Sequence, residues 1–131
     1  MRHTLSTILI ALLVTGCLAE KEVPNCQKFK DGTFIMENDG RKTKIIRRGN
    51  TQFEFFDGDP TPLPFHVKWI DECTYTLSPK EEYFKTHPGA PRDGIVTVKI
   101  FKTTATSYTQ TASSNFDSNV ITAEIKLVKP E

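Results

Sequence analysis

The chain has 131 residues, of which 37% are hydrophobic and 25% are charged. This length suits one small domain and excludes a multidomain enzyme. Lysine and arginine together number 17, against 16 aspartate and glutamate, which gives a formal net charge of +1. Because this balance leaves no basic excess to neutralise a phosphate backbone, we expect no nucleic-acid partner.

The first residues have the profile of a bacterial export signal. A short basic start, Met1 to Thr4, precedes an apolar run from Leu5 to Val14. The run has about ten residues, whereas a membrane-spanning helix needs about 20. We therefore expect a cleaved signal peptide over residues 1–16 and no transmembrane anchor.

The apolar run ends on a cysteine. Val14-Thr15-Gly16-Cys17 resembles the lipobox of bacterial lipoproteins, in which the cysteine is lipidated before signal peptidase II cuts ahead of it. The resemblance implies that Cys17 is the lipidated mature N-terminus and that residues 17–25 are a tether to the membrane. Burial of two or three acyl chains, at about 0.8 kcal/mol per CH₂, makes such an anchor effectively permanent. An ordinary secreted protein, in which Cys17 has no role, is the alternative.

The residues after Cys17 indicate which envelope membrane holds the protein and on which side of that membrane the domain lies. Leu18 follows the cysteine where a retention signal would have aspartate, so a resemblance to the enterobacterial sorting rule implies the outer membrane. Glu20-Lys21-Glu22 resembles the signal that sends some Bacteroidota lipoproteins to the cell surface. A solvated linker explains this cluster equally well, so the periplasmic and the surface face both stay open.

Lipidation of Cys17 leaves Cys26 and Cys73 as an even pair in an oxidising compartment, and we predict a disulfide between them. In the chain-entropy model this bond contributes up to roughly 4 kcal/mol of stability. A zinc site needs about four nitrogen or sulfur ligands at characteristic spacings. The sequence has no Cys-x-x-Cys or His-x-x-His pair, so we expect no metal and no cofactor.

From Gly32 onward, apolar residues recur at every second position, which is the period of a β-strand. The pattern predicts eight strands, close to residues 32–36, 43–48, 51–57, 65–69, 73–77, 95–101, 105–112 and 121–127. Short turns join most of them. We therefore expect an all-β domain over residues 26–131, a single antiparallel meander that closes into a small lipocalin-like barrel.

Two hairpins have predictable registers. Gly49-Asn50 predicts a two-residue turn that sets Ile46 opposite Phe53. In the next hairpin, a three-residue loop over residues 70–72 places the apolar side chains of both strands on the same face of the sheet, whereas a two-residue turn would divide them between the two faces. This loop predicts the pairs Trp69–Cys73, Val67–Tyr75 and Phe65–Leu77.

The aromatic residues are the expected core. Phe34, Phe53, Phe55, Phe65, Trp69, Tyr75 and Tyr108 form this set. Core packing is favoured over lining of a ligand cavity, because an eight-stranded barrel is only just wide enough for side chains or one small ligand. The insertion Ser78 to Asp93 predicts a long loop with one helical turn around Lys80 to Phe84. On this loop we expect Tyr83 and Phe84 to be exposed binding anchors at the open end of the barrel.

Few residues suggest catalysis or metal binding. His66 falls on the outward face of its strand, and His87 falls in a turn. Asp57 and Asp59 resemble the start of a calcium loop, but Pro60 follows, so an ordinary turn is expected.

A basic cluster falls on the first hairpin, and it consists of Lys42, Lys44, Arg47 and Arg48. A solvated hairpin face explains this cluster, and contact with anionic lipid headgroups is the alternative. The chain has no nucleophile elbow, phosphate-binding glycine loop or zinc-protease helix.

Three segments together resemble a known family. Cys26, Phe29 to Phe34 and the hairpin Phe65 to Leu77 are similar to small Bacteroidota lipoproteins with a lipocalin-like β-meander. Gly32-Thr33-Phe34 also resembles the Gly-x-Trp opening of lipocalins, with Phe in place of Trp. Some proteins of that family carry a topoisomerase name, but this chain lacks the length of a strand-cleaving enzyme.

The resemblance and the motifs together predict a non-catalytic, membrane-anchored envelope lipoprotein. Its partner is expected to be a small hydrophobic ligand or another envelope protein. An envelope enzyme, with a site that known motifs do not reveal, is the alternative.

Overall fold

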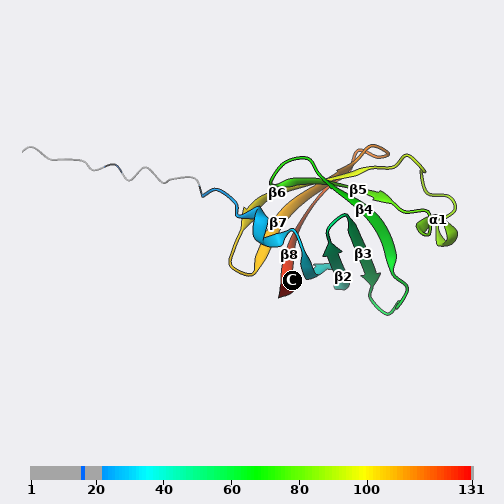
Figure 1. Ribbon diagram of the computed structural model, residues 1–131, viewed down its shortest axis with the longest axis horizontal. Coiled ribbons are helices and arrows are strands. Elements are labelled where there is room, and N and C mark those ends of the chain that lie inside the picture. Colours follow the sequence, from blue (N-terminus) through cyan, green and yellow to red (C-terminus); the bar gives the residue numbers. More distant parts are fainter. Residues whose placement is uncertain (1–15, 17–21, 131) are drawn as a thin grey trace, which may run out of the picture.

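The computed structural model describes Gly16 and residues 22–130. The predicted signal peptide except Gly16, together with Cys17 and most of the tether, lies outside the described residues. Eight antiparallel strands form one closed barrel in chain order, with β1 also paired to β8 (Figure 1). The strands are β1 (Gly32–Asn38), β2 (Arg41–Arg48), β3 (Thr51–Phe56), β4 (Leu63–Trp69), β5 (Thr74–Pro79), β6 (Val96–Thr103), β7 (Ser107–Ser114) and β8 (Val120–Pro130). The predicted all-β meander of eight strands is confirmed.

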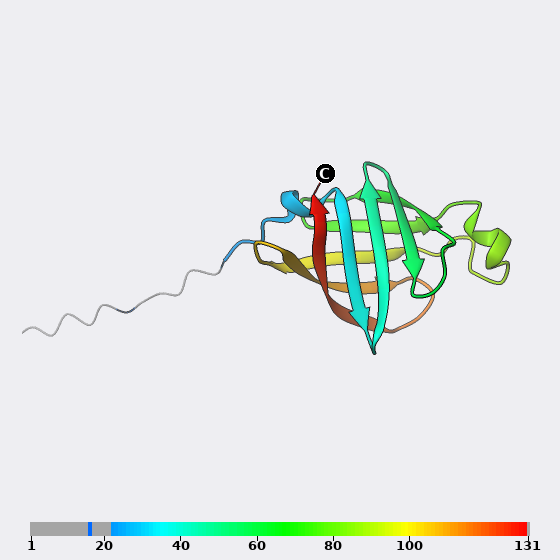
Figure 2. The same cartoon turned by 90° about the horizontal axis from the view of Figure 1, so that it is seen from below.

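Two short helical segments mark opposite ends of the barrel. A 3-10 turn, η1 (Cys26–Phe29), precedes β1, and a helical turn, α1 (Tyr83–Thr86), lies in the long loop between β5 and β6. Figures 1 and 2 show η1 at one end of the molecule and α1 at the other. In the part of the chain that the structure describes, no helix is both long and apolar enough to cross a membrane.

The end that carries η1 is closed. Phe29 is fully buried and plugs the barrel at this end. The backbone N–H of Asn25 donates a hydrogen bond to Thr103 Oγ1 at 2.8 Å, and the N–H of Gly49 donates to Asp31 Oδ1 at 2.9 Å. These contacts hold the segment before β1 against the β2–β3 turn and the end of β6.

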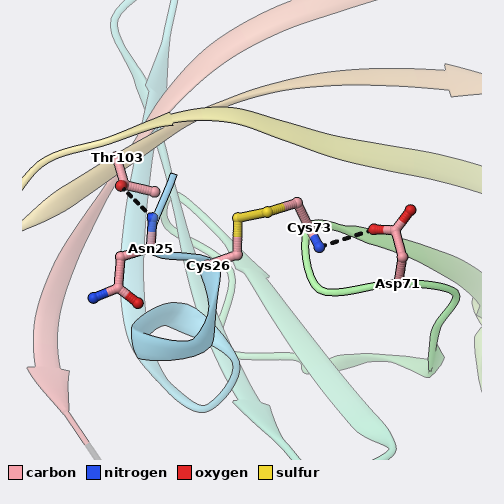
Figure 3. Close-up of a disulfide and its surroundings, with 5 residues drawn as sticks. All are labelled: Asn25, Cys26, Asp71, Cys73 and Thr103. Atoms are coloured by element: carbon pink, nitrogen blue, oxygen red, sulfur yellow. Dashed lines mark hydrogen bonds between the residues drawn. A yellow bond between two sulfur atoms is a disulfide. The ribbon is translucent and has the colours of Figure 1, made fainter. Parts of the chain in front are cut away.

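A disulfide joins η1 to the loop between β4 and β5, as Figure 3 shows. It links Cys26 to Cys73 across a sequence separation of 47, with the two Cα atoms 5.3 Å apart. The predicted pairing is therefore confirmed. Asp71 Oδ1 accepts a hydrogen bond from the Cys73 N–H at 2.9 Å, which fixes the loop that carries this cysteine.

One predicted register is confirmed and the other is wrong by two residues. Ile46 pairs with Phe53 across the Gly49-Asn50 turn, as expected. In the next hairpin the pairs are Phe65–Pro79, Val67–Leu77 and Trp69–Tyr75. The loop therefore spans residues 70–73. Cys73 lies outside the strand, where the disulfide ties it to η1. A shift of two residues leaves every side chain on its predicted face of the sheet.

Strand β3 turns its polar side chains into the barrel. Gln52 is 1% exposed, and Glu54 lines an interior cavity. Phe53 and Phe55 lie on the outer face, so the expectation that they belong to the core is wrong. The reason is the register, because Gln52 pairs directly with Arg47, whose side chain is also inside.

Gly32 opens β1 at a close approach to β8. Its φ is +149°, and a Cβ added there would lie 3.1 Å from Leu127 Cδ1, from the carbonyl oxygen of Lys129 and from Phe34 Cζ. Only glycine fits such a position without displacing its neighbours. The Gly32-Thr33-Phe34 motif therefore serves the closure of the barrel, with Phe34 fully buried beneath it.

Candidate functional site

Arg47 is the largest fully buried side chain of the described residues, with 0% exposure. It shares the inward face of β2 with Thr43 and Ile45, which are buried as well. The interpretation of Arg47 as part of a basic surface cluster is therefore wrong. Lys42, Lys44 and Arg48 are exposed, so three members of the predicted cluster remain on the hairpin surface.

Five groups accept hydrogen bonds from the Arg47 guanidinium: two backbone carbonyls, two tyrosine hydroxyls and the side-chain oxygen of Gln52. Nε donates to the carbonyl oxygen of Lys30 at 2.9 Å, and Nη2 donates to that of Phe29 at 3.3 Å. Nη1 donates to the Tyr75 hydroxyl at 2.7 Å, and Nη2 donates to the Tyr108 hydroxyl at 2.8 Å. A buried charge is tolerated only where such partners replace water. The guanidinium therefore binds the N-terminal segment to β5 and β7.

Aromatic faces complete the surroundings of this charge. The Arg47 guanidinium carbon lies 4.8 Å from the ring centre of Phe34 and 4.7 Å from that of Tyr75, within the range of cation–π attraction. Phe29 and Tyr108 pack against each other with ring centres 5.3 Å apart. Burial raises the pKa of Tyr108 well above its ordinary value, so its phenol stays neutral. These side chains fill the closed half of the barrel.

Gln52 connects Arg47 to a carboxyl group. Its Oε1 accepts a hydrogen bond from Arg47 Nη1 at 3.2 Å, while its Nε2 donates to Glu54 Oε1 at 3.0 Å. Because the two ends of one amide serve a cation and a carboxyl group, both partners favour the same orientation of the side chain. Arg47, Gln52 and Glu54 thus form a polar line from the closed end toward the middle of the barrel.

Glu54 lies where two cavities meet. The inner cavity has a volume of about 160 Å³, and its lining includes Met36, Ile45, Tyr75, Leu77, Val98 and Ala123. The outer cavity has a volume of about 280 Å³, and its lining includes Phe56, Leu63, Phe65, Tyr83, Pro91 and Phe116. Glu54, Leu77 and Val96 line both cavities. We call the two together the chamber, which occupies the half of the barrel that Arg47 and its neighbours leave unfilled.

The environment of Glu54 opposes its ionisation. Burial raises the pKa of this carboxyl above its ordinary value, and the hydrogen bond from Gln52 and the charge of Arg47 counteract only part of that effect. An ionised Glu54 therefore costs folding stability. An ionisable group kept in a cavity at such a cost is typical of a functional site.

The two predicted anchors of the long loop, Tyr83 and Phe84, differ in their exposure and in whether they line a cavity. Phe84 is 7% exposed and lies beneath the Arg92 guanidinium, whose central carbon is 4.6 Å from the Phe84 ring centre. The expectation that Phe84 is exposed is therefore wrong. Tyr83 is half-buried, stacks on His87 with ring centres 4.4 Å apart, and packs against Phe65 at 5.3 Å. Of the two, Tyr83 lines the outer cavity.

The remaining candidate residues lie away from the chamber lining. His66 is exposed on β4, as its position in the alternation predicted. Asp57 is exposed, and Asp59 Oδ1 accepts a hydrogen bond from the Thr61 N–H at 2.9 Å, which makes their loop a capped turn. Across Gly16 and residues 22–130, no group of three His, Cys, Asp or Glu side chains lies close enough to hold a metal ion.

Sequence reasoning missed Gln52 and Glu54 as site residues. The available signal was the turn itself, because a two-residue loop at Gly49-Asn50 puts Arg47 and Gln52 on one face and Ile46 and Phe53 on the other. Hydrophobicity favoured burial of the second face. Only the acceptors supplied by distant strands and by the η1 segment make burial of the first face possible.

No protein-family model, curated protein or solved structure matches the chain. The chemistry of the site therefore follows from its own residues. Apolar and aromatic walls surround one carboxyl group, with amide side chains beside it. A lining of this kind is typical of sites that hold an apolar molecule and orient it through a few polar contacts.

Replacement of Arg47 by methionine should destabilise the domain by at least about 3 kcal/mol, because several buried acceptors lose a charged donor at once. Chemical denaturation of purified Arg47→Met measures this loss. Lys44→Met is the matched control, since Lys44 lies on the exposed face of the same strand. Equal stability of the two variants would contradict the structural role of the buried guanidinium.

The stability of Glu54→Gln relative to that of wild type should increase as the pH rises. Because the pKa of Glu54 is higher in the folded protein than in the unfolded chain, the folded state binds the proton more tightly. The contribution of Glu54 to the free energy of unfolding is therefore largest in acid and falls as the pH rises through the folded pKa. Glutamine removes this dependence.

The stability difference between Glu54→Gln and wild type is measured by denaturation from about pH 4 to about pH 8, the range in which a raised carboxyl pKa takes effect. The difference should shift in favour of Glu54→Gln across this range. Glu124→Gln, on the exposed side of β8, is the control. A pH-independent difference would show that burial does not disfavour the charge of Glu54.

Proposed function

We propose that this protein is a lipid-anchored, non-catalytic binding protein of a bacterial envelope whose barrel holds a small apolar ligand. The chamber with Glu54 at the junction of its two cavities carries the proposal. Ligand sites in proteins are typically concave and mostly apolar, with a few polar groups that fix orientation. The chamber has each of these properties.

The volume of the chamber favours a small ligand. An apolar cavity of about 150 Å³ accommodates a single benzene ring. The inner cavity, at about 160 Å³, is of this size, and the outer cavity, of about 280 Å³, shares Glu54, Leu77 and Val96 with it. A molecule of one to three rings, or one with a short alkyl chain, is therefore favoured over a long-chain lipid.

A binding role is favoured over the alternative of an envelope enzyme. Hydrolysis of a glycosidic bond, for example, uses two carboxyl groups that flank the substrate. The described lining of the chamber contributes one carboxyl group, and its nearest polar neighbour is the amide of Gln52. Docking of an envelope protein on the long loop is less favoured than cargo, because Phe84 is buried rather than available to a partner.

Anchoring is proposed from the lipobox-like segment Val14 to Cys17. The tether would reach the domain at Asn25 and Cys26, which lie at the closed end. Figure 2 shows α1 at the opposite end, and Tyr83 of α1 lines the outer cavity, so we place the mouth of the chamber there. An anchored barrel would therefore admit its ligand from the side that faces away from the membrane. The resemblance of Leu18 to an outer-membrane sorting signal favours that membrane.

The cavity proposal is tested with N-phenyl-1-naphthylamine, an apolar dye whose fluorescence rises when it leaves water. Wild type should enhance the fluorescence, and Val96→Trp should abolish the enhancement, because Val96 lines both cavities and the indole would fill them. Ile95→Trp is the matched control, since Ile95 is 42% exposed beside it in the chain. Equal dye binding by the two variants would show that the dye does not enter the chamber.

The anchor proposal is tested by metabolic labelling with a clickable fatty acid. Wild type should carry the label and remain in the membrane fraction. Cys17→Ala should lose the label and be either soluble or unprocessed, because no other thiol lies at the cleavage point. Cys26→Ser is the control, since it removes a cysteine that lies away from the cleavage point. Strong labelling of Cys17→Ala would overturn the assignment.

A further inference from the structure

The outer cavity combines aromatic faces with a carboxyl group. Phe56, Phe65, Tyr83 and Phe116 contribute to its lining together with Glu54. The face of an aromatic ring carries partial negative charge and attracts cations, and a carboxylate attracts them more strongly. Among the described residues that line the chamber, none is lysine, arginine or histidine.

We propose that the ligand of the chamber is a small amphipathic amine, whose cationic amino group pairs with Glu54 while its apolar part occupies the cavities. The inference rests on the proposed function and names the chemical class of the ligand. An anionic ligand would meet the Glu54 carboxylate with no basic side chain of the lining to compensate it. A purely apolar ligand would leave that carboxylate without an opposite charge in the chamber.

Glu54 is placed to receive such a group. Gln52 Nε2 donates to Oε1 of Glu54, at 3.0 Å. An ionised carboxylate can accept about four hydrogen bonds, so acceptor capacity remains for a ligand, above all at Oε2. Because Glu54 lines both cavities, a cation paired with it lies at their junction. The apolar part can then extend inward toward Leu77 and Val98.

The buried arginine is not among the side chains that a ligand in the chamber would contact. Arg47 is 0% exposed, lies outside the lining of both cavities and is joined to Glu54 by hydrogen bonds through Gln52. Its charge and the Gln52 hydrogen bond both favour the ionised form of Glu54 against the effect of burial. Arg47 and Gln52 are therefore positioning residues, which orient the Glu54 carboxyl group and offset part of the cost of its ionisation, so that a ligand of opposite charge can supply the rest.

The test compares three ligands of nearly equal size that differ in the head group: 3-phenylpropylamine, 3-phenylpropanol and 3-phenylpropanoate. Isothermal titration calorimetry at neutral pH uses the purified mature protein. The amine should bind at least about tenfold more tightly than the alcohol, because a charged hydrogen bond is much stronger than a neutral one. The acid should bind most weakly.

Two variants assign the effect to Glu54. Glu54→Gln should reduce the affinity for the amine to that for the alcohol while leaving the affinity for the alcohol unchanged. Glu124→Gln, which removes an exposed carboxylate from β8, should leave all three affinities unchanged. If Glu54→Gln fails to fold, the comparison of the three ligands on wild type decides the question by itself.

The outcomes separate this inference from the proposed function. Equal binding of amine and alcohol, or tightest binding of the acid, would overturn the amine assignment and leave the cavity proposal standing. Absence of binding by all three ligands, while N-phenyl-1-naphthylamine still binds, would overturn the amine assignment as well. If the dye also fails to bind, the proposed function fails together with it.

Discussion

The constraint on which the rest of the structure depends is the burial of one positive charge, that of Arg47. A guanidinium removed from water needs a hydrogen-bond acceptor for each donor it presents. Here two acceptors are backbone carbonyls of the segment before β1, two are hydroxyls from β5 and β7, and the fifth is the side-chain oxygen of Gln52 on β3. These groups come from parts of the chain that meet only when the barrel is closed and the N-terminal segment covers its end. The charge is therefore tolerable in the complete fold alone, which makes Arg47 a strong determinant of closure.

The same constraint explains the polarity of β3 and the chamber above it. Because Arg47 is inside, its direct partner Gln52 is inside, and two residues further along the same face lies Glu54. A polar line thus enters the half of the barrel that an apolar β3 would have filled with Phe53 and Phe55. The domain accepts a raised pKa at Glu54 and loses two aromatic residues from its core. The polar residues of β3 and the unfilled chamber do not increase the stability of the fold. A binding site, in contrast, needs both a cavity and a polar group inside it.

Much of the fold could be predicted from the sequence because alternation depends on local residues. The eight strands and the Gly49-Asn50 turn are such features. The disulfide was predicted differently, from the even pair of cysteines that remains after Cys17. Even the second hairpin, displaced by two residues, kept its faces, since the side-chain period of a strand is two. The site could not be predicted in the same way. Arg47 and Glu54 look like solvated residues beside apolar neighbours, and their burial depends on acceptors far away in the chain. Likewise, Phe84 looked exposed because its cover, Arg92, reaches it only in the folded loop.

The two ends of the barrel differ in what holds them, and this difference bears on how a ligand would enter. The disulfide, the Arg47 hydrogen bonds and the buried Phe29 all act on the closed end. Around the mouth, the Arg92 pair with Glu81 is solvent-exposed and contributes little. With the proposed tether at the closed end, a bilayer lipid would have to leave the membrane and cross the length of the domain to enter. A small molecule from the aqueous side has no such barrier, and it also suits the size of the chamber.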